Sequence, residues 1–183
     1  SLKIDLMLEE RVLDLPMREA DVAIRMKEPS QADLIRKRLM NIKMRLYATQ
    51  EYLAETGMPQ SMADFSQHRL ICQHAGTAQV AAGANLVQDL MSHDIPSKLT
   101  VNNYFGVLQA VLNHLGIGVL PDYITVDFPH LVRVLPETES GEVPVFLAYP
   151  EELRHSKRVS AFRDFITEEI LAFRKEHQAQ NLL

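Results

Sequence analysis

The sequence of 183 residues contains a single cysteine, Cys72, and no apolar run long enough to cross a membrane. One thiol excludes an internal disulfide, and so few cysteines are typical of a protein that works in a reducing cytosol. A membrane helix needs roughly 18 consecutive apolar residues, and no signal peptide is visible at the start. We therefore expect a cytoplasmic protein with no membrane partner.

An excess of positive charge is also missing. The formal net charge is -5 and the isoelectric point is near 5.8, whereas nucleic-acid-binding modules usually present a basic face. Five cations do gather in one region, and we expect them to form the solvated face of two strands: Arg36, Lys37, Arg38, Lys43 and Arg45. The share of hydrophobic residues, 46%, is ordinary for a globular protein with one domain or two small lobes.

Catalytic and cofactor motifs are absent as well. The sequence has neither a G-x-S-x-G elbow nor a G-x-G-x-x-G nucleotide fingerprint, and its seven histidines do not show metal-ligand spacing. Cys72 lies in an apolar segment, which favours a small buried side chain over a nucleophile. We therefore expect no catalytic residues, no metal and no cofactor, and we do not expect an enzyme.

What is present is a succession of short apolar segments, typical of strands, that alternate with helical segments. Alternation of this kind predicts an α/β protein with largely parallel sheets. Four segments have the clearest patterns: strands over 3–8 and 21–25, a helix over 104–115 that is apolar nearly all round, and a long amphipathic helix over 156–178.

Polar residues follow three of the expected strands, and ligands of open α/β sheets bind beyond the carboxyl ends of strands. These residues are Arg25, the pair Gln73 and His74, and the pair Asn102 and Asn103. Asn103 precedes a helix whose first N–H groups can receive a carboxylate, although both asparagines could serve only as cap and turn. Arg25 could pair with an anionic ligand or form a salt bridge across the cleft.

Four segments, in order and spacing, resemble the effector-binding domain of LysR-type transcriptional regulators. "DLPMREADVAIRM" is similar to the family's D-L…D-V-A-I-R element. "YLAETGMPQSMADFSQHRLI" is similar to its Y-L-x-x-x-G-x-P segment, with Phe65 where leucine is usual. "VNNYFGVLQAVLNHLGIGVLPDY" is similar to the A-V-x-x-G-x-G-I-x-x-L-P element, and "FLAYPEELRHSKRVSAFRDFITEEI" to the closing helix. The resemblance covers nearly the whole chain.

This resemblance implies a periplasmic-binding-protein-like fold of type 2, in which two crossing strands join two α/β lobes around a ligand cleft. Lobe one would comprise residues 1–46 and 149–183, and lobe two residues 47–148, with hinges near Leu46–Tyr47 and Ala148–Tyr149. The ligand-binding residues implied by strand ends and resemblance together are Arg25, Gln73, His74, Asn102, Asn103 and Pro121.

The implied function is that of a small-molecule effector-sensing domain in a bacterial regulator, with a small carboxylate or aromatic acid as effector. A solute-binding protein or an enzyme on the same two-lobe fold is the alternative. The family's winged helix-turn-helix and its first strand and helix have no counterpart here, so we expect operator DNA to be bound only through that absent domain and the effector site to be incomplete.

The missing first strand also bears on assembly. Without it, either residues 3–8 pair directly with 21–25, or a strand from a second copy fills the gap. We expect a homo-oligomer built partly through lobe one, with a dimer for this chain and a tetramer for a full-length regulator.

Overall fold

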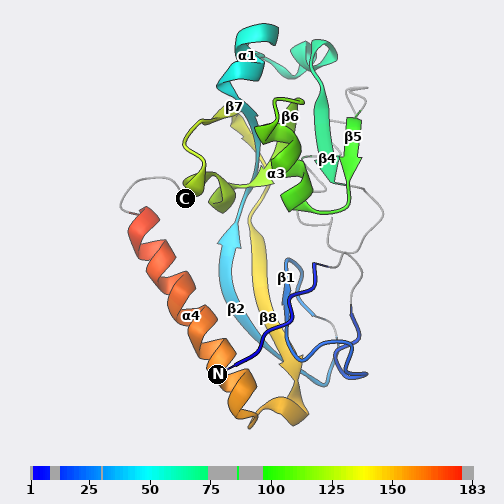
Figure 1. Ribbon diagram of the computed structural model, residues 1–183, viewed down its shortest axis with the longest axis vertical. Coiled ribbons are helices and arrows are strands. Elements are labelled where there is room, and N and C mark those ends of the chain that lie inside the picture. Colours follow the sequence, from blue (N-terminus) through cyan, green and yellow to red (C-terminus); the bar gives the residue numbers. More distant parts are fainter. Residues whose placement is uncertain (1, 9–12, 30, 74–85, 87–96, 179–183) are drawn as a thin grey trace.

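The computed structural model of the protein describes residues 2–8, 13–29, 31–73, 86 and 97–178. Two β-sheets lie end to end, and two long stretches of chain run through both of them (Figure 1). Sheet A contains β1 (Ala23–Arg25), β8 (Val143–Pro150) and β2 (Leu34–Ile42) in that order. Sheet B contains, in order, β5 (Ser97–Val101), β4 (Leu70–Gln73), β6 (Ile117–Pro121), β3 (Met44–Thr49) and β7 (Leu131–Glu139).

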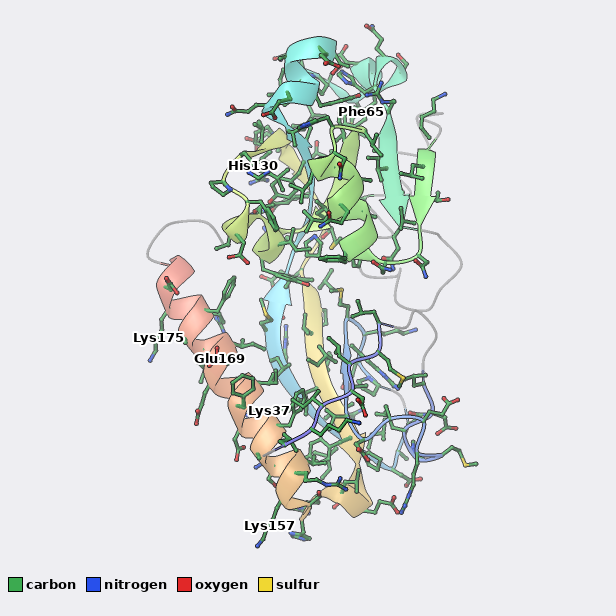
Figure 2. All side chains as sticks on the ribbon, viewed as in Figure 1. Lys37, Phe65, His130, Lys157, Glu169 and Lys175 are labelled. Carbon is green, nitrogen blue, oxygen red and sulfur yellow. The ribbon has the colours of Figure 1, made fainter. Side chains whose placement is uncertain are left out.

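Helices cover both sheets. The long helix α4 (Lys157–Gln178) runs beside sheet A, and α1 (Gln50–Thr56) and α3 (Tyr104–Leu112) belong to the half that holds sheet B (Figure 1). Short 3₁₀ helices span Met62–Gln67, Asp122–Asp127 and Glu151–Leu153. Lys157, Glu169 and Lys175 lie along α4, whereas Phe65 lies in the sheet-B half, where its side chain is fully buried (Figure 2).

The mixed α/β architecture with two sheets agrees with the expected fold class, but the expectation of largely parallel sheets is wrong. Only β4 is parallel to its neighbours, β5 and β6, among the strands that the structure describes. β8 is antiparallel to both β1 and β2, and β3 is antiparallel to both β6 and β7. The reason is that β7 and β8 carry the chain back along the path of β2 and β3, so that the crossing strands run in opposite directions.

The chain changes sheet at two points. It passes from β2 to β3 between Ile42 and Met44, and from β7 to β8 between Glu139 and Val143. The division into lobes at 46/47 and 148/149 remains a prediction, and both of those positions lie inside strands, past the points where the chain changes sheet.

The expected strand over 3–8 is wrong. Residues 2–8 form no strand, and their side chains are exposed, with Leu6 reaching 81%. They therefore do not pair with β1, which pairs with β8 along one edge and with no other described strand along the other. Alternating apolar residues form a stable strand only where a neighbouring strand accepts their backbone hydrogen bonds.

Helix α3 is shorter and more exposed than expected. It ends at Leu112, since His114 adopts a left-handed conformation with φ of 58°. Val107, Leu108 and Val111 are buried, but Phe105 is 58% and Leu115 48% exposed. One face of α3 packs on sheet B and the other meets solvent, so the expectation of burial all round is wrong.

Helix α1 is bounded by a cap at each end. Thr49 caps it by accepting a hydrogen bond from the Tyr52 N–H at 3.4 Å. The chain leaves the helix at Gly57 with φ of 85°, a conformation that favours glycine.

His68 is a buried titratable group of the sheet-B core. Its Nδ1 lies 3.3 Å from the Tyr52 hydroxyl, which also accepts the Arg69 backbone N–H at 3.0 Å. Since that hydroxyl has one proton, it donates it to Nδ1 only when the imidazole is neutral. Burial lowers the pKa of His68 below its ordinary value, and the Asp64 carboxylate offsets part of this shift.

We expect His68 to make the protein sensitive to mild acid. As pH falls below about 6.5, the unfolded chain takes up the proton before the folded one does, so stability is lost until the folded pKa is passed. Urea titrations between pH 7.5 and 5 should give a smaller loss for His68→Gln than for the parent. The exposed His155→Gln should keep the parental slope, and equal slopes for all three proteins would refute the assignment.

Candidate ligand site

The three parallel strands of sheet B end at one edge. Gln73 is the last residue of β4, Val101 the last of β5 and Pro121 the last of β6. The arrowheads of β4 and β5 point toward the half of the molecule that holds sheet A (Figure 1). Carboxyl ends of parallel strands are the usual location of ligand sites in α/β folds, and this edge is therefore the candidate ligand site.

Hydrogen bonds bring three of the predicted residues together at this edge. The Gln73 side chain donates to the Asn102 carbonyl at 3.3 Å, and the Asn103 side chain donates to Asn102 Oδ1 at 3.1 Å. Gln73 is buried, Asn103 is half-buried and Asn102 is exposed. The edge thus carries a compact set of amide groups, partly inside and partly in contact with solvent.

Asn103 connects this set to helix α3. Its Oδ1 accepts the Gly106 N–H at 2.8 Å and caps the helix, as the sequence predicts. A Cβ atom on Gly106 would lie 2.3 Å from a Val101 methyl group, so glycine lets the first turn approach the end of β5 closely. The capping role is confirmed, and a role in ligand binding stays a prediction.

Two further predicted site residues, Pro121 and His74, belong to this half in the sequence, and the structure describes only Pro121. Pro121 is buried and lies opposite Met44 in the pairing of β6 with β3, immediately before Asp122. His74 lies outside the described residues.

Arg25 belongs to sheet A rather than to this edge. Its side chain is 6% exposed, and its guanidinium donates to the Leu13 carbonyl. Burial lowers the pKa of Arg25, and the Asp14 carboxylate counteracts that shift. A salt bridge from Arg25 to a carboxylate of the sheet-B half does not occur among the described residues, and contact with an effector remains a prediction.

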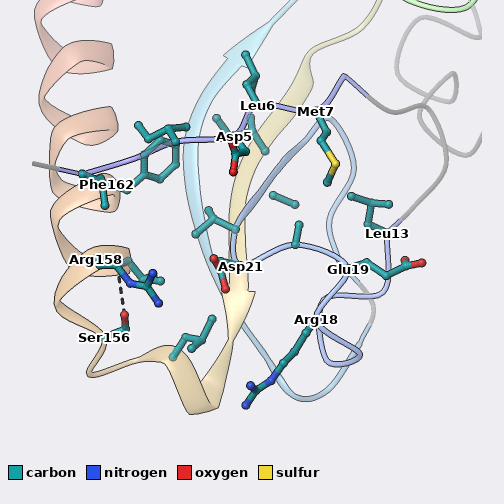
Figure 3. Close-up of a pocket in the computed structure, with 18 of the residues that line it drawn as sticks. Asp5, Leu6, Met7, Leu13, Arg18, Glu19, Asp21, Ser156, Arg158 and Phe162 are labelled. Carbon is teal, nitrogen blue, oxygen red and sulfur yellow. Dashed lines mark hydrogen bonds between the residues drawn. The ribbon is translucent and has the colours of Figure 1, made fainter.

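A cavity of about 700 Å³ adjoins β1 (Figure 3). It lies between residues 2–8, the segment 18–25 and the beginning of α4. Of the predicted site residues that the structure describes, Arg25 alone lines it. Leu6, Met7, Leu13 and Phe162 give it a largely apolar wall, with Arg18 and Arg158 among its charged residues (Figure 3).

Charged side chains cluster where the chain changes sheet, and the sequence analysis did not predict a functional role for this cluster. Arg36, Lys37 and Arg38 are exposed as expected, but Lys43 and Arg45 are not simply solvated. Both bind the Glu139 carboxylate, and Arg45 also lies 3.9 Å from Asp122. The signal available in the sequence was Asp122 itself, an acid directly after an apolar strand, in a family motif.

Two kinds of site find no support. Among the described residues, no three His, Cys, Asp or Glu side chains are close enough together to hold a metal ion. Within the same part of the chain, none of the helices combines the length and the apolar character that a membrane span requires.

Comparison with known sequences gives relatives of one kind. The family model described as LysR substrate binding domain matches residues 1–171. A probable HTH-type transcriptional regulator of Klebsiella pneumoniae, LtrA, is 28% identical over 177 residues, which cover 91% of this chain and 56% of that protein. An uncharacterized HTH-type regulator of Haemophilus influenzae is 24% identical over 84% of this chain and 54% of its own length. The chain thus spans about half the length of the curated relatives it matches.

Solved structures show the same fold. The regulatory domain of CrgA from Neisseria meningitidis aligns with a TM-score of 0.72 at 23% identity, covering 85% of this chain and 78% of that one. The effector domain of AmpR from Pseudomonas aeruginosa aligns with a TM-score of 0.65 at 15% identity, covering 93% and 82%. With a family match over most of its length and this two-sheet architecture, the chain belongs to the LysR substrate-binding domain family.

Proposed function

We propose that this chain senses a small carboxylate or aromatic acid on behalf of a bacterial LysR-type regulator. The observation that carries the proposal is the cluster of Gln73, Asn102 and Asn103 at the carboxyl ends of parallel strands, in a chain that matches the LysR substrate binding domain over residues 1–171. Amide N–H groups beside a helix N-terminus suit a carboxylate. Arg25, His74 and Pro121 complete the proposed set.

Regulation would follow from a change in the relative position of the two halves. An effector that binds one arrangement more tightly shifts the population toward it, and couplings between sites are typically about 1–3 kcal/mol. Relatives are named as HTH-type regulators, so we place operator binding in a helix-turn-helix domain, and the whole protein in the cytoplasm. We assign no catalytic activity.

The test is a thermal-shift experiment with benzoate and short aliphatic carboxylates. At a ligand concentration of 100 times Kd, binding adds about 2.7 kcal/mol, which raises Tm by roughly 5–10 °C for a chain of this size. Asn103→Asp keeps an effective N-cap but places a negative charge against the ligand, so we expect the ligand-induced shift to disappear.

The matched control is Asn113→Asp at the other end of α3, which should keep the ligand-induced shift. A screen in which no acid shifts Tm, or in which Asn103→Asp responds like the parent, would contradict the proposed site.

We further propose that the chain forms a homodimer through the sheet-A half. Large apolar side chains are exposed there in unusual density, and such patches mark interaction surfaces: Leu2, Ile4, Leu6, Met7, Leu8, Met17 and Ile24. The outer edge of β1 pairs with none of the described strands.

Sedimentation at micromolar concentration should therefore show a dimer. Leu6→Lys, at a side chain that contributes little to the fold, should give a monomer with an unchanged melting temperature. The control is Glu55→Lys on α1, in the sheet-B half, which should remain dimeric. A parent protein that sediments as a clean monomer would rule the dimer out.

A further inference from the structure

Residues 43 and 44, where the chain passes from β2 to β3, are fastened by their backbone to the sheet-B half. The Lys43 N–H donates to Asp122 Oδ2 at 3.1 Å, and the Lys43 carbonyl accepts the Asp122 N–H at 2.9 Å. The Met44 N–H donates to Ser140 Oγ at 2.9 Å, and the Met44 carbonyl accepts the Ser140 N–H at 2.9 Å. All four backbone groups of residues 43 and 44 are thus held by residues that adjoin strands of sheet B.

Ion pairs surround these hydrogen bonds. The Glu139 carboxylate forms ion pairs with Lys43, with the Arg45 Nε at 3.1 Å and with an Arg133 nitrogen at 2.9 Å. Arg45 also reaches toward Asp122, whose side chain is almost wholly buried. We call Lys43, Arg45, Asp122, Arg133, Glu139 and Ser140 the crossover clamp.

Burial of the Asp122 carboxylate is energetically unfavourable. Asp122 is 4% exposed, and its Oδ1 is buried with no hydrogen-bond partner among the described residues. Burial raises the pKa of Asp122, although the Lys43 N–H and the Arg45 guanidinium oppose the shift. A buried carboxylate that is only partly satisfied is expensive to keep, which favours a functional reason for it.

The other side of the crossing belongs to sheet A. Ile42 pairs with Val143 as the last register position of β2 and β8, and the Asn41 side chain donates to the Glu142 carboxylate. Between the two anchored blocks remain the backbone torsions of Ile42 and of Gly141. A side chain at Gly141 would meet nothing within 4 Å, and the Gly141 carbonyl accepts a hydrogen bond from the adjacent Ser140 Oγ at 2.7 Å.

We infer that the crossover clamp makes Lys43 and Ser140 part of the rigid sheet-B half, so that the two halves turn about the backbone torsions of Ile42 and Gly141. Bending at residues 43–46 would break the hydrogen bonds and ion pairs of the clamp, whereas bending at Ile42 and Gly141 leaves those bonds intact and alters the local hydrogen bond from Ser140 Oγ to the Gly141 carbonyl. Hinges of two-domain proteins are a few such residues. The inference deepens the proposed function, because it locates the movement that effector binding would bias.

The experiment measures the distance between the halves without ligand. Cysteines introduced at His130 and Glu169, exposed positions on the sheet-B half and on α4 (Figure 2), carry fluorophores or spin labels. Cys72 stays unlabelled because it is buried and its pKa is raised to about 11. We expect Ser140→Ala to broaden the distance distribution by about twofold, as the movement spreads to residues 43–46.

Asp122→Asn should broaden the distribution less, because the amide can still accept the Lys43 N–H while the ion pair with Arg45 is lost; it also decides the matter if Ser140→Ala does not fold. Ser66→Ala, the same chemical change at an exposed position of the sheet-B half, is the control. If Tm falls in the clamp variants while the distance distribution keeps the parental width, the clamp only stabilises the fold and the inference is overturned.

A second arm separates this inference from the proposed function. The Tm of the same proteins is measured with and without benzoate. If the distance distribution broadens in the clamp variants but benzoate does not shift Tm, the clamp is upheld and the proposed function is contradicted. If benzoate shifts Tm but the distribution keeps its parental width, the proposed function is upheld and the clamp is contradicted.

Discussion

Val111→Asp should lower the free energy of unfolding by about 4 kcal/mol, the largest effect that we expect from a single substitution in this chain. Val111 is completely buried on the inner face of α3, and its methyl group would be 2.4 Å from a Cβ on Gly118 of β6. It packs in a hydrophobic cluster with Tyr47, Ile71, Val107, Leu108, Ala110 and Leu120. A carboxylate there must remain protonated or unfold the helix from the sheet.

Urea denaturation measures this loss, and Gln109→Asp is the matched control. Gln109 occupies the exposed face of the same helix, so its substitution should change stability by no more than about 0.5 kcal/mol. If Val111→Asp unfolds at the parental urea concentration, α3 does not pack on sheet B as described.

Gly116→Ala should cost about 3 kcal/mol, since it forces backbone rather than side chains to move. A Cβ on Gly116 would lie 2.2 Å from the Arg69 carbonyl oxygen, the same oxygen that accepts the Ile117 N–H at 2.8 Å. Relief of the clash separates the start of β6 from the start of β4 and weakens that hydrogen bond.

Gly141→Ala tests the specificity of this effect, because a Cβ there has open space around it. We expect its melting temperature to stay within about 2 °C of the parent. Equal losses for the two glycine variants would mean that the close approach at Gly116 does not determine its cost.

Local signals predicted the elements that depend on local chemistry. The apolar spacing from Val159 onward predicted α4, and Asn103 was predicted as the cap of α3. Residues 3–8 show the limit of such signals, because a strand also needs a partner and the pattern of one segment does not supply it. The antiparallel return of β8 along β2 was likewise beyond reach, since it depends on residues about a hundred positions apart.

The candidate site divides in the same way. Gln73, Asn102 and Asn103 were found because strand ends and a helix cap have short-range signatures, and the structure brings them into contact. Arg25 was recognised as a guanidinium at a strand end, but its acceptor, the Leu13 carbonyl, is a backbone atom in a preceding loop that no pattern indicates. The crossover clamp was missed because its charges meet only after β3, β6 and β7 assemble.

Among the described strands, β1 and β2 pair with β8 alone, and this pairing has a consequence for synthesis on the ribosome. Sheet A requires residues 143–150, so its two early strands must wait until about a hundred further residues have been translated. At about 5–20 residues per second, this delay is of the order of 5–20 seconds, during which Leu34 and its apolar neighbours lack their partner. Contacts so distant in sequence also slow folding after release. Nascent chains stalled before Val143 should therefore be cut by protease in the β1–β2 region, and chaperones that shield apolar segments should bind there first.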